Sequence, residues 1–146
     1  MEIFTIGFTR TTAEDFFERL RSNRIERLLD VRLNNKSQLA GFAKRNDLAY
    51  FLRELLGADY EHTFLLAPTQ DILDDFKKKK EMPWEEYEGR FLSLMRERRI
   101  EERLKPAEFA RRTVLLCSES TPEQCHRRLV AEYLRDCWDD VRVIHL

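Results

Sequence analysis

The sequence predicts an α/β domain, with a mostly parallel sheet, helices on both faces and a helical insertion between the third and fourth strands. Short apolar runs rich in β-forming residues alternate with amphipathic helical patterns along the chain. The connections between these runs are long, as crossovers between parallel strands must be. The 146 residues include no linker-like stretch, so we expect residues 1–146 to fold as a single domain around one core.

The chain is predicted to start with a strand and a helix. The strand covers residues 3–7 and stops at Gly7, where the backbone can turn tightly. Thr11 or Thr12 can cap the helix that follows, because acidic residues lie in its first turn. The apolar face of this helix consists of Phe16, Phe17 and Leu20.

A second strand is predicted over residues 25–32. Asp30 and Arg32 would be costly inside a sheet, so we expect them at the C-terminal end of the strand. The polar segment that follows, residues 33–41, is longer than most connections between a strand and a helix. We therefore expect it to line or cover something.

The next predicted elements are a helix over residues 47–56 and a third strand over residues 60–66. The helix has a leucine-rich stripe, and Gly57 can end it in the left-handed conformation. From residue 69 the pattern becomes helical and strongly charged. This segment is followed by another predicted helix over residues 83–98, and then by a short helix and a connector.

The fourth strand, residues 113–117, runs into a polar turn and the last helix. Thr121 and Gln124 have the spacing of a capping box, in which each side chain binds a backbone N–H at the start of a helix. This pattern predicts a helix over residues 121–137. A final strand over residues 141–146 completes the sheet.

Three predicted strands end in residues that suit a binding site. The three segments are Gly7–Arg10, Asp30–Arg32 and Cys117–Glu119. In parallel sheets, ligands bind outside the carboxyl ends of the strands. We therefore expect the functional site where these segments converge.

Cys117, Cys125 and His126 are the candidates for catalysis. Helical phase places His126 on the inward stripe of the last helix, facing the turn after Cys117. A helix N-terminus and a nearby imidazolium both favour the thiolate form of a cysteine. The hypothesis is nucleophilic catalysis by Cys117 or Cys125, with His126 as acid or base. Asp30 would be the carboxylate that orients the histidine.

The same residues also suggest two simpler interpretations. Cysteines are common core residues, so Cys117 and Cys125 can be structural, with His126 fixing the turn. A zinc site would need a fourth ligand, and the sequence contains no C-x-x-C pair to supply one. No metal and no cofactor are therefore predicted.

An anion-binding pocket is the second feature expected at this edge of the sheet. The helix N-terminus would be surrounded by four basic residues that hold a phosphate or carboxylate group, namely Arg10, Arg32, Lys36 and Arg127. The alternative is that the arginines only pair with neighbouring carboxylates, Arg32 with Asp30 and Arg127 with Glu119. The predicted ligand-binding residues are Gly7, Thr9, Arg10, Arg32, Lys36, Ser118, Glu119 and Arg127.

Two known cysteine-based sites match the sequence poorly. A tyrosine-phosphatase loop needs an arginine six positions after its cysteine, and Glu123 stands there after Cys117. The segment Leu29–Arg32 and a strand that ends in cysteine resemble rhodanese-like sulfur transferases. The glutamate at position 119 would repel the anion of that site, so this resemblance is only an analogy.

Composition limits the partners. The formal net charge is −1, from 26 basic and 27 acidic residues, so nucleic acid is not indicated by net charge. The lysines of residues 77–80 precede glutamates and are typical of a solvated helix end. No apolar run could span a bilayer. The odd number of cysteines, three, and the lack of a signal-peptide pattern predict a reduced, cytoplasmic protein. The sequence does not define the oligomeric state.

The assembled motifs resemble the DUF488 family, a widespread prokaryotic domain without an established general activity. The resemblance covers nearly the whole chain and implies the position of the site rather than its reaction. It rests on Thr5–Phe8, Leu29–Arg32, Gly41–Phe42, the aromatic residues Trp84, Tyr87 and Phe91, and above all Leu116–Glu119 with Cys125–Arg127.

We therefore expect a DUF488-like protein that binds a small anionic ligand, a nucleotide or another phosphate-bearing molecule, at the C-terminal ends of the strands. A Cys/His-dependent hydrolase or transferase is one form of this function. The alternative is a non-catalytic binding or regulatory module that acts through its charged helical surface.

Overall fold

In the computed structural model, which describes residues 1–36, 40–77 and 82–146, five parallel strands form one sheet. The strand order is β3-β2-β4-β1-β5, and each neighbouring pair is parallel. The predicted α/β class with a parallel sheet is confirmed. The strands are β1 (Glu2–Gly7), β2 (Arg27–Asp30), β3 (Asp59–His62), β4 (Thr113–Cys117) and β5 (Arg142–His145).

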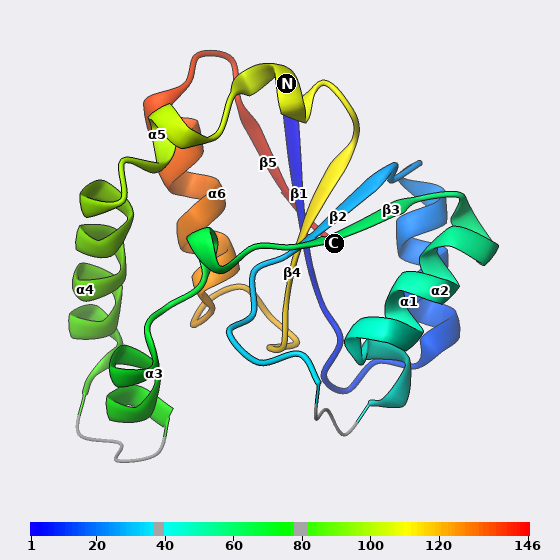
Figure 1. The fold of residues 1–146 in the computed structure, drawn as a ribbon, viewed down its shortest axis with the longest axis horizontal. Coiled ribbons are helices and arrows are strands. Elements are labelled where there is room, and N and C mark those ends of the chain that lie inside the picture. The colour runs from blue at the N-terminus through cyan, green and yellow to red at the C-terminus, as the bar shows by residue number, and fades with distance from the viewer. Residues whose placement is uncertain (37–39, 78–81) are drawn as a thin grey trace.

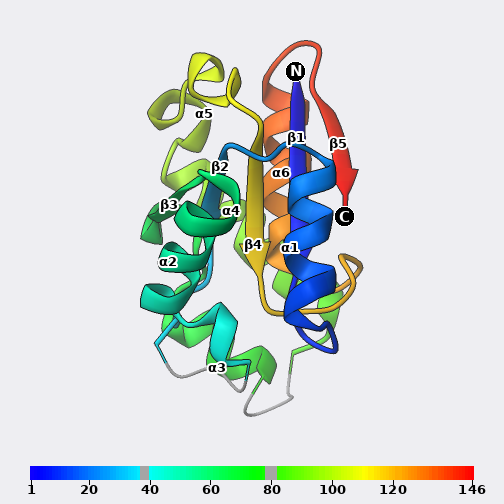
Figure 2. The same ribbon diagram turned by 90° about the vertical axis from the view of Figure 1, so that its right-hand side faces the viewer.

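Helices cover both faces of the sheet, as Figures 1 and 2 show. One face carries α1 (Ala13–Ser22) and α2 (Arg45–Leu56), and the other carries α4 (Trp84–Glu97) and α6 (His126–Cys137). The described chain between β3 and β4 is helical apart from its connections. It contains α3 (Gln70–Lys77), α4, α5 (Ile100–Arg103) and short 3₁₀ turns over Phe64–Leu66 and Pro106–Phe109.

The sheet separates two apolar cores. Leu116 belongs to the core under α1 and α2, whereas Leu115 belongs to the core under α4 and α6. This division follows from the alternation of side chains along a strand. Cys117 is two positions after Leu115, so its side chain lies on the α4 and α6 face, where it joins the same core.

Two predicted helix ends are confirmed in atomic detail. Thr12 caps α1, since its hydroxyl oxygen accepts a hydrogen bond of 3.1 Å from the backbone N–H of Asp15. Gly57 ends α2 with φ of 63°, the left-handed conformation that glycine adopts without a steric cost.

The predicted start of the last helix is wrong. The capping-box pattern of Thr121 and Gln124 does not open α6, which begins at His126 with Cys125 in an extended N-cap conformation. Residues 118–125 form an irregular turn instead. The side chain of Arg127 binds the backbone carbonyl of this turn at position 119, so a contact from within the helix replaces the local capping pattern.

The third strand is shorter than predicted. β3 ends at His62, and Phe64–Leu66 form a 3₁₀ turn whose first N–H groups are partly satisfied by the hydroxyl of Thr63. A guanidinium nitrogen of Arg98 binds the carbonyls of residues 64, 65 and 67 at 3.1, 2.8 and 2.7 Å. The carbonyl groups after β3 therefore accept hydrogen bonds from Arg98, the C-cap residue of α4, and not from a neighbouring strand.

Candidate functional site

The three polar strand ends converge as predicted. Gly7 of β1 is in register with Cys117 of β4, and Asp30 of β2 is in register with Leu116. All three strands are parallel, so their carboxyl ends lie at the same edge of the sheet. The expected site location is therefore a real meeting point of three chain segments.

The turn after Cys117 lies tightly against the end of β1. A Cβ atom at Gly7 would lie 1.6 Å from the carbonyl oxygen of Glu119, so only glycine permits this approach. The backbone N–H and the hydroxyl of Thr9 both donate hydrogen bonds to the carbonyl of Ser118, at 3.1 and 2.5 Å. Gly7 and Thr9, predicted to bind a ligand, thus fix the conformation of the turn.

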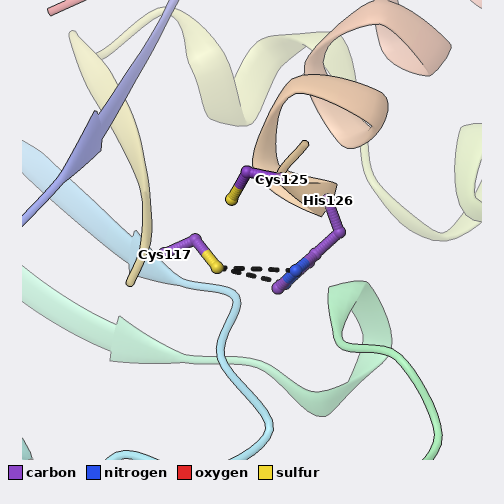
Figure 3. Close-up of side chains that lie close together, drawn as sticks. All are labelled: Cys117, Cys125 and His126. Carbon is purple, nitrogen blue, oxygen red and sulfur yellow. Dashed lines mark hydrogen bonds between the residues drawn. The ribbon is translucent and has the colours of Figure 1, made fainter. Parts of the chain in front are cut away.

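Cys117, Cys125 and His126 form one buried cluster, drawn in Figure 3. The Sγ atom of Cys117 lies 3.4 Å from Nδ1 of His126 and 3.9 Å from Nε2. The histidine ring also packs on Phe91, with ring centroids 5.4 Å apart. The inward position that helical phase predicted for His126 is confirmed, and α4 closes the cluster from the other side.

A backbone carbonyl fixes the orientation of His126. Its Nε2 lies 2.7 Å from the carbonyl oxygen of Val31. Because a carbonyl only accepts, Nε2 carries a proton and donates it to this bond. Nδ1 therefore faces the sulfur of Cys117, and the thiol proton can pass between Sγ and Nδ1 along a contact of 3.4 Å.

The two buried cysteines differ in acidity. A hydrogen bond from Cys125, the backbone N–H of Ser118 and the positive charge of Arg127 lower the pKa of the Cys117 thiol, although burial opposes them. Burial and the hydrogen bond to Cys117 raise the pKa of Cys125. Cys117 is thus the sulfur that carries negative charge more readily, and Cys125 is the donor beside it.

Arg127 is the cation next to this cluster. Its side chain is 0% exposed and donates to the carbonyl of Glu119 at 2.6 Å and to Sγ of Cys125 at 3.4 Å. Among the described residues it has no carboxylate partner, so the alternative of an ion pair with Glu119 is wrong. The Glu119 carboxylate is instead paired with Lys77. A buried cation without a carboxylate favours negative charge on the adjacent sulfurs.

Asp30 is the centre of a separate buried network. Arg32 binds both of its carboxylate oxygens at 2.8 Å, and Tyr60 donates to it at 2.6 Å. Burial alone would raise the pKa of Asp30, but these partners outweigh burial and lower it. The expectation that Asp30 orients His126 is wrong, because these partners occupy the carboxylate and Val31 supplies the acceptor for the histidine.

Arg32 links this network to a pocket beside the cysteine cluster. The side chain is 3% exposed, and its Nη1 atom has no hydrogen-bond partner in the described part of the chain. The pocket has a volume of about 190 Å³. Its walls include Arg32, Cys117, Ser118, Glu119, Cys125 and His126 from the strand ends and α6, and Phe76, Lys77 and Tyr87 from α3 and α4.

The remaining predicted residues lie outside this pocket. Arg10 and Thr9 line a neighbouring hollow together with the start of α1. Lys36 lines another hollow, next to His62. Of the predicted lysine run, Lys77 pairs with Glu119, whereas residues 78–80 lie outside the described residues. The four predicted anion-binding cations therefore do not surround one ligand, and of these four only Arg32 lines the pocket.

Several pocket residues escaped the sequence analysis. The sequence indicated Phe76 only as part of an apolar helix face, Tyr87 as part of such a face and of the family resemblance, and Gln124 as part of a cap, but none of them as a pocket residue. Tyr87 is 3% exposed, and burial raises its pKa, so its hydroxyl stays neutral. An apolar stripe does not indicate which of its members borders a cavity, so the pattern did not identify these residues as pocket residues.

The described part of the chain contains one group of donors with the spacing of a metal site. The two sulfurs and a ring nitrogen of Cys117, Cys125 and His126 lie within 4.8 Å of one another. Thiolate and imidazole are the donors that zinc prefers. The absence of a fourth protein ligand set this site aside on sequence grounds. A site that borders a pocket does not need one, because water or a ligand can take the open position.

Comparisons with known proteins identify a family whose function is not known. None of the described helices combines the length and apolarity that crossing a membrane requires. Neither among curated proteins nor among solved structures does the chain have a significant match. The sequence profile described as "Domain of unknown function DUF488" matches residues 12–134, which include Asp30, Cys117, Cys125 and His126. The chain therefore belongs to the DUF488 family.

Proposed function

We propose that this protein binds a small anionic ligand, a nucleotide or another phosphate-bearing molecule, in the pocket beside Cys117. We further propose that it acts on this ligand as a Cys/His-dependent hydrolase or transferase. One observation carries the proposal: the Val31 carbonyl holds Nε2 of His126, so Nδ1 faces the Cys117 sulfur at 3.4 Å, in the wall of a pocket. This arrangement is the one that general-base activation of a thiol requires.

The anionic character of the ligand follows from Arg32. Its Nε and Nη2 atoms are held by Asp30 and by the carbonyl of Ala43, which fixes the plane of the guanidinium. The remaining nitrogen, Nη1, is buried without a described partner. Leaving such a charged donor unpaired costs more than about 1–3 kcal/mol. Arg32 lines the pocket, so a small shift of its side chain that brought Nη1 to an anionic group there would remove that cost.

The proposed reaction uses Cys117 as the nucleophile. The thiol proton passes to Nδ1 of His126, and the Sγ electron pair forms a bond to the electrophilic atom of the ligand. The bond to the leaving group breaks, and the leaving group takes the proton back from Nδ1. Water then cleaves the covalent intermediate in a hydrolase, or a second nucleophile does so in a transferase, and the thiol is restored.

Thiol alkylation tests the proposal. Metal-free protein is treated with iodoacetamide at neutral pH, and the modified cysteines are identified by mass spectrometry. Cys117 should react faster than the more exposed Cys137, and His126→Ala should slow Cys117 without changing Cys137. If neither Cys117 nor Cys125 is labelled in the folded protein, Cys117 is no nucleophile, and the non-catalytic binding module becomes the better account.

A further inference from the structure

We propose that Cys117, Cys125 and His126 form a binding site for Zn²⁺, with the pocket supplying the fourth position of the ion. This inference goes beyond the proposed function and does not depend on it. The three donors come from the last residue of β4, the N-cap residue of α6 and the first residue of α6. Figure 3 shows both sulfurs and the imidazole turned toward the same small volume.

The donor spacing fits a tetrahedral ion. Zinc lies about 2.3 Å from a thiolate sulfur and about 2.0 Å from an imidazole nitrogen, which places such a pair of ligands roughly 3.5 Å apart at a tetrahedral angle. The observed separation between Sγ of Cys117 and Nδ1 of His126 is 3.4 Å. All three donor atoms lie within 4.8 Å of one another, so small side-chain rotations would bring them around one ion.

The histidine is held in the orientation that a ligand needs. Metal-binding histidines almost always donate their other ring N–H to a carbonyl or carboxylate, which fixes the tautomer and strengthens the ligand. Here Nε2 donates to the Val31 carbonyl at 2.7 Å, leaving Nδ1 for the ion. Contact with the ring of Phe91 further limits rotation of the imidazole.

Burial disfavours a thiolate at Cys125, and two features of its surroundings act against this burial. Arg127, fully buried, donates to Sγ of Cys125 at 3.4 Å, and Cys125 is the N-cap of a 12-residue helix whose dipole favours negative charge. Two thiolates balance the charge of Zn²⁺, which leaves the charge of Arg127 uncompensated among these groups. The fourth ligand, entering from the pocket, is therefore expected to be an anion or hydroxide.

The metal and the proposed nucleophile compete for the same sulfur. A bound ion would occupy Sγ of Cys117 and Nδ1 of His126 together, so the zinc form would be unreactive toward alkylation. This competition separates the two proposals, because each predicts a property of the metal-free or the metal-bound protein that the other does not.

Cobalt provides the direct test, because tetrahedral Co²⁺ bound to thiolates absorbs strongly in the visible and near ultraviolet. Protein stripped with a chelator and kept reduced by a phosphine is titrated with Co²⁺. One equivalent should produce the thiolate-to-metal charge-transfer absorption, and Zn²⁺ but not Mg²⁺ should abolish it. If the wild-type protein shows no charge-transfer band after one equivalent, the site does not exist.

Variants locate the ion. Cys125→Ser should weaken Zn²⁺ binding by at least roughly 10–100-fold. Loss of a residue that only hydrogen-bonds to a metal ligand already has an effect of this size, and Cys125 is itself a proposed ligand. Cys137→Ser, at an exposed cysteine outside the cluster, should bind normally. Unchanged binding by Cys125→Ser, or lost binding by Cys137→Ser, would refute the assignment. Circular dichroism checks the fold of each variant. If Cys125→Ser does not fold, the wild-type titration and Cys137→Ser still decide.

The failures of the two proposals are distinguishable. Metal-free Cys125→Ser retains Cys117 and His126, so under the proposed function Cys117 should still be alkylated. Zn²⁺ should protect Cys117 in the wild-type protein and not in this variant. If Cys117 is alkylated but no metal binds, the proposed function stands and the zinc site is rejected. If metal binds but metal-free Cys117 is not alkylated, the zinc site stands and the proposed nucleophile is rejected.

Discussion

A Cβ atom at Gly7 would lie 1.6 Å from the carbonyl oxygen of Glu119 and 2.9 Å from Nη1 of Arg127. Real Cβ atoms do not approach a backbone carbonyl this closely. The end of β1 and the turn after Cys117 therefore touch through their backbones, and Arg127 donates a hydrogen bond to the same carbonyl at 2.6 Å. The side chain of Gly7, a single hydrogen atom, thus allows the close approach between the first strand and the turn that carries the cysteine cluster.

Gly7→Ala should destabilise the protein and disturb the cluster. The added methyl group must displace backbone rather than a flexible side chain, so we expect a loss of at least about 2 kcal/mol. Gly89→Ala is the matched control, because this glycine lies in α4 with nothing within 4 Å of the new atom. It should gain about 0.5–1 kcal/mol. Urea unfolding measures both, and equal stabilities for the two variants would contradict the close contact.

The ion pair of Asp30 predicts acid sensitivity. The pKa of Asp30 is lowered in the folded protein, below the value of about 3.9 expected when unfolded. The carboxylate therefore stabilises the fold above that value, and the contribution disappears as the pH falls through the folded pKa. Asp30→Asn should be less stable than the wild-type protein at pH 7. As the pH falls from about 5 to about 2, the variant should lose less stability than the wild-type protein, because it has no carboxylate to protonate at this position. Parallel pH dependence of both proteins would count against the prediction.

Ligand binding should depend on Arg32 rather than on Arg10. Thermal shift with a panel of nucleotides and phosphosugars should identify anions that stabilise the protein. Arg32→Lys keeps a positive charge near Asp30 but removes Nη1, and it should weaken binding by roughly 10–100-fold, the worth of one charged hydrogen bond. Arg10→Lys, in the neighbouring hollow, should bind normally. Equal weakening by both variants would place the ligand elsewhere.

The pair of Lys77 and Glu119 should adjust the affinity for anions. Both residues line the pocket and form an ion pair that is nearly half exposed, so each effect should be modest. Glu119→Gln removes the negative charge and should tighten anion binding by about 2–5-fold, while Lys77→Gln should weaken it by a similar factor. Titrations at low and high salt measure both. Changes of the same sign in the two variants would show that charge is not the cause.

Local patterns predicted the framework well. Thr12 and Gly57 mark the ends of helices where the sequence placed them, because capping depends on residues a few positions apart. The convergence of three strand ends followed from chain direction in a parallel sheet. The inward position of His126 followed from helical phase. These features use short-range geometry, which a single sequence contains.

The errors concern the choice of partner for a side chain, which helical phase and strand alternation do not determine. The acceptor for His126 is the carbonyl of Val31, 95 residues away, and a backbone carbonyl has no signature in the sequence. Asp30 was assigned to the histidine, but Tyr60 and the neighbouring Arg32 occupy it. The helix predicted from Thr121 begins at His126 instead, and Arg127 binds the turn that precedes it. Each error arose where one side chain had several partners within reach.

The strand order also has a consequence for biosynthesis. β4 lies between β1 and β2, yet it is the fourth strand to leave the ribosome. Until it emerges, β1 has no neighbouring strand on that side, and the anchor from Thr9 to Ser118, 109 residues apart, cannot form. Non-local pairing of this kind slows folding. The cysteine cluster at this edge of the sheet is therefore completed only after β4 and the start of α6 have joined the earlier strands.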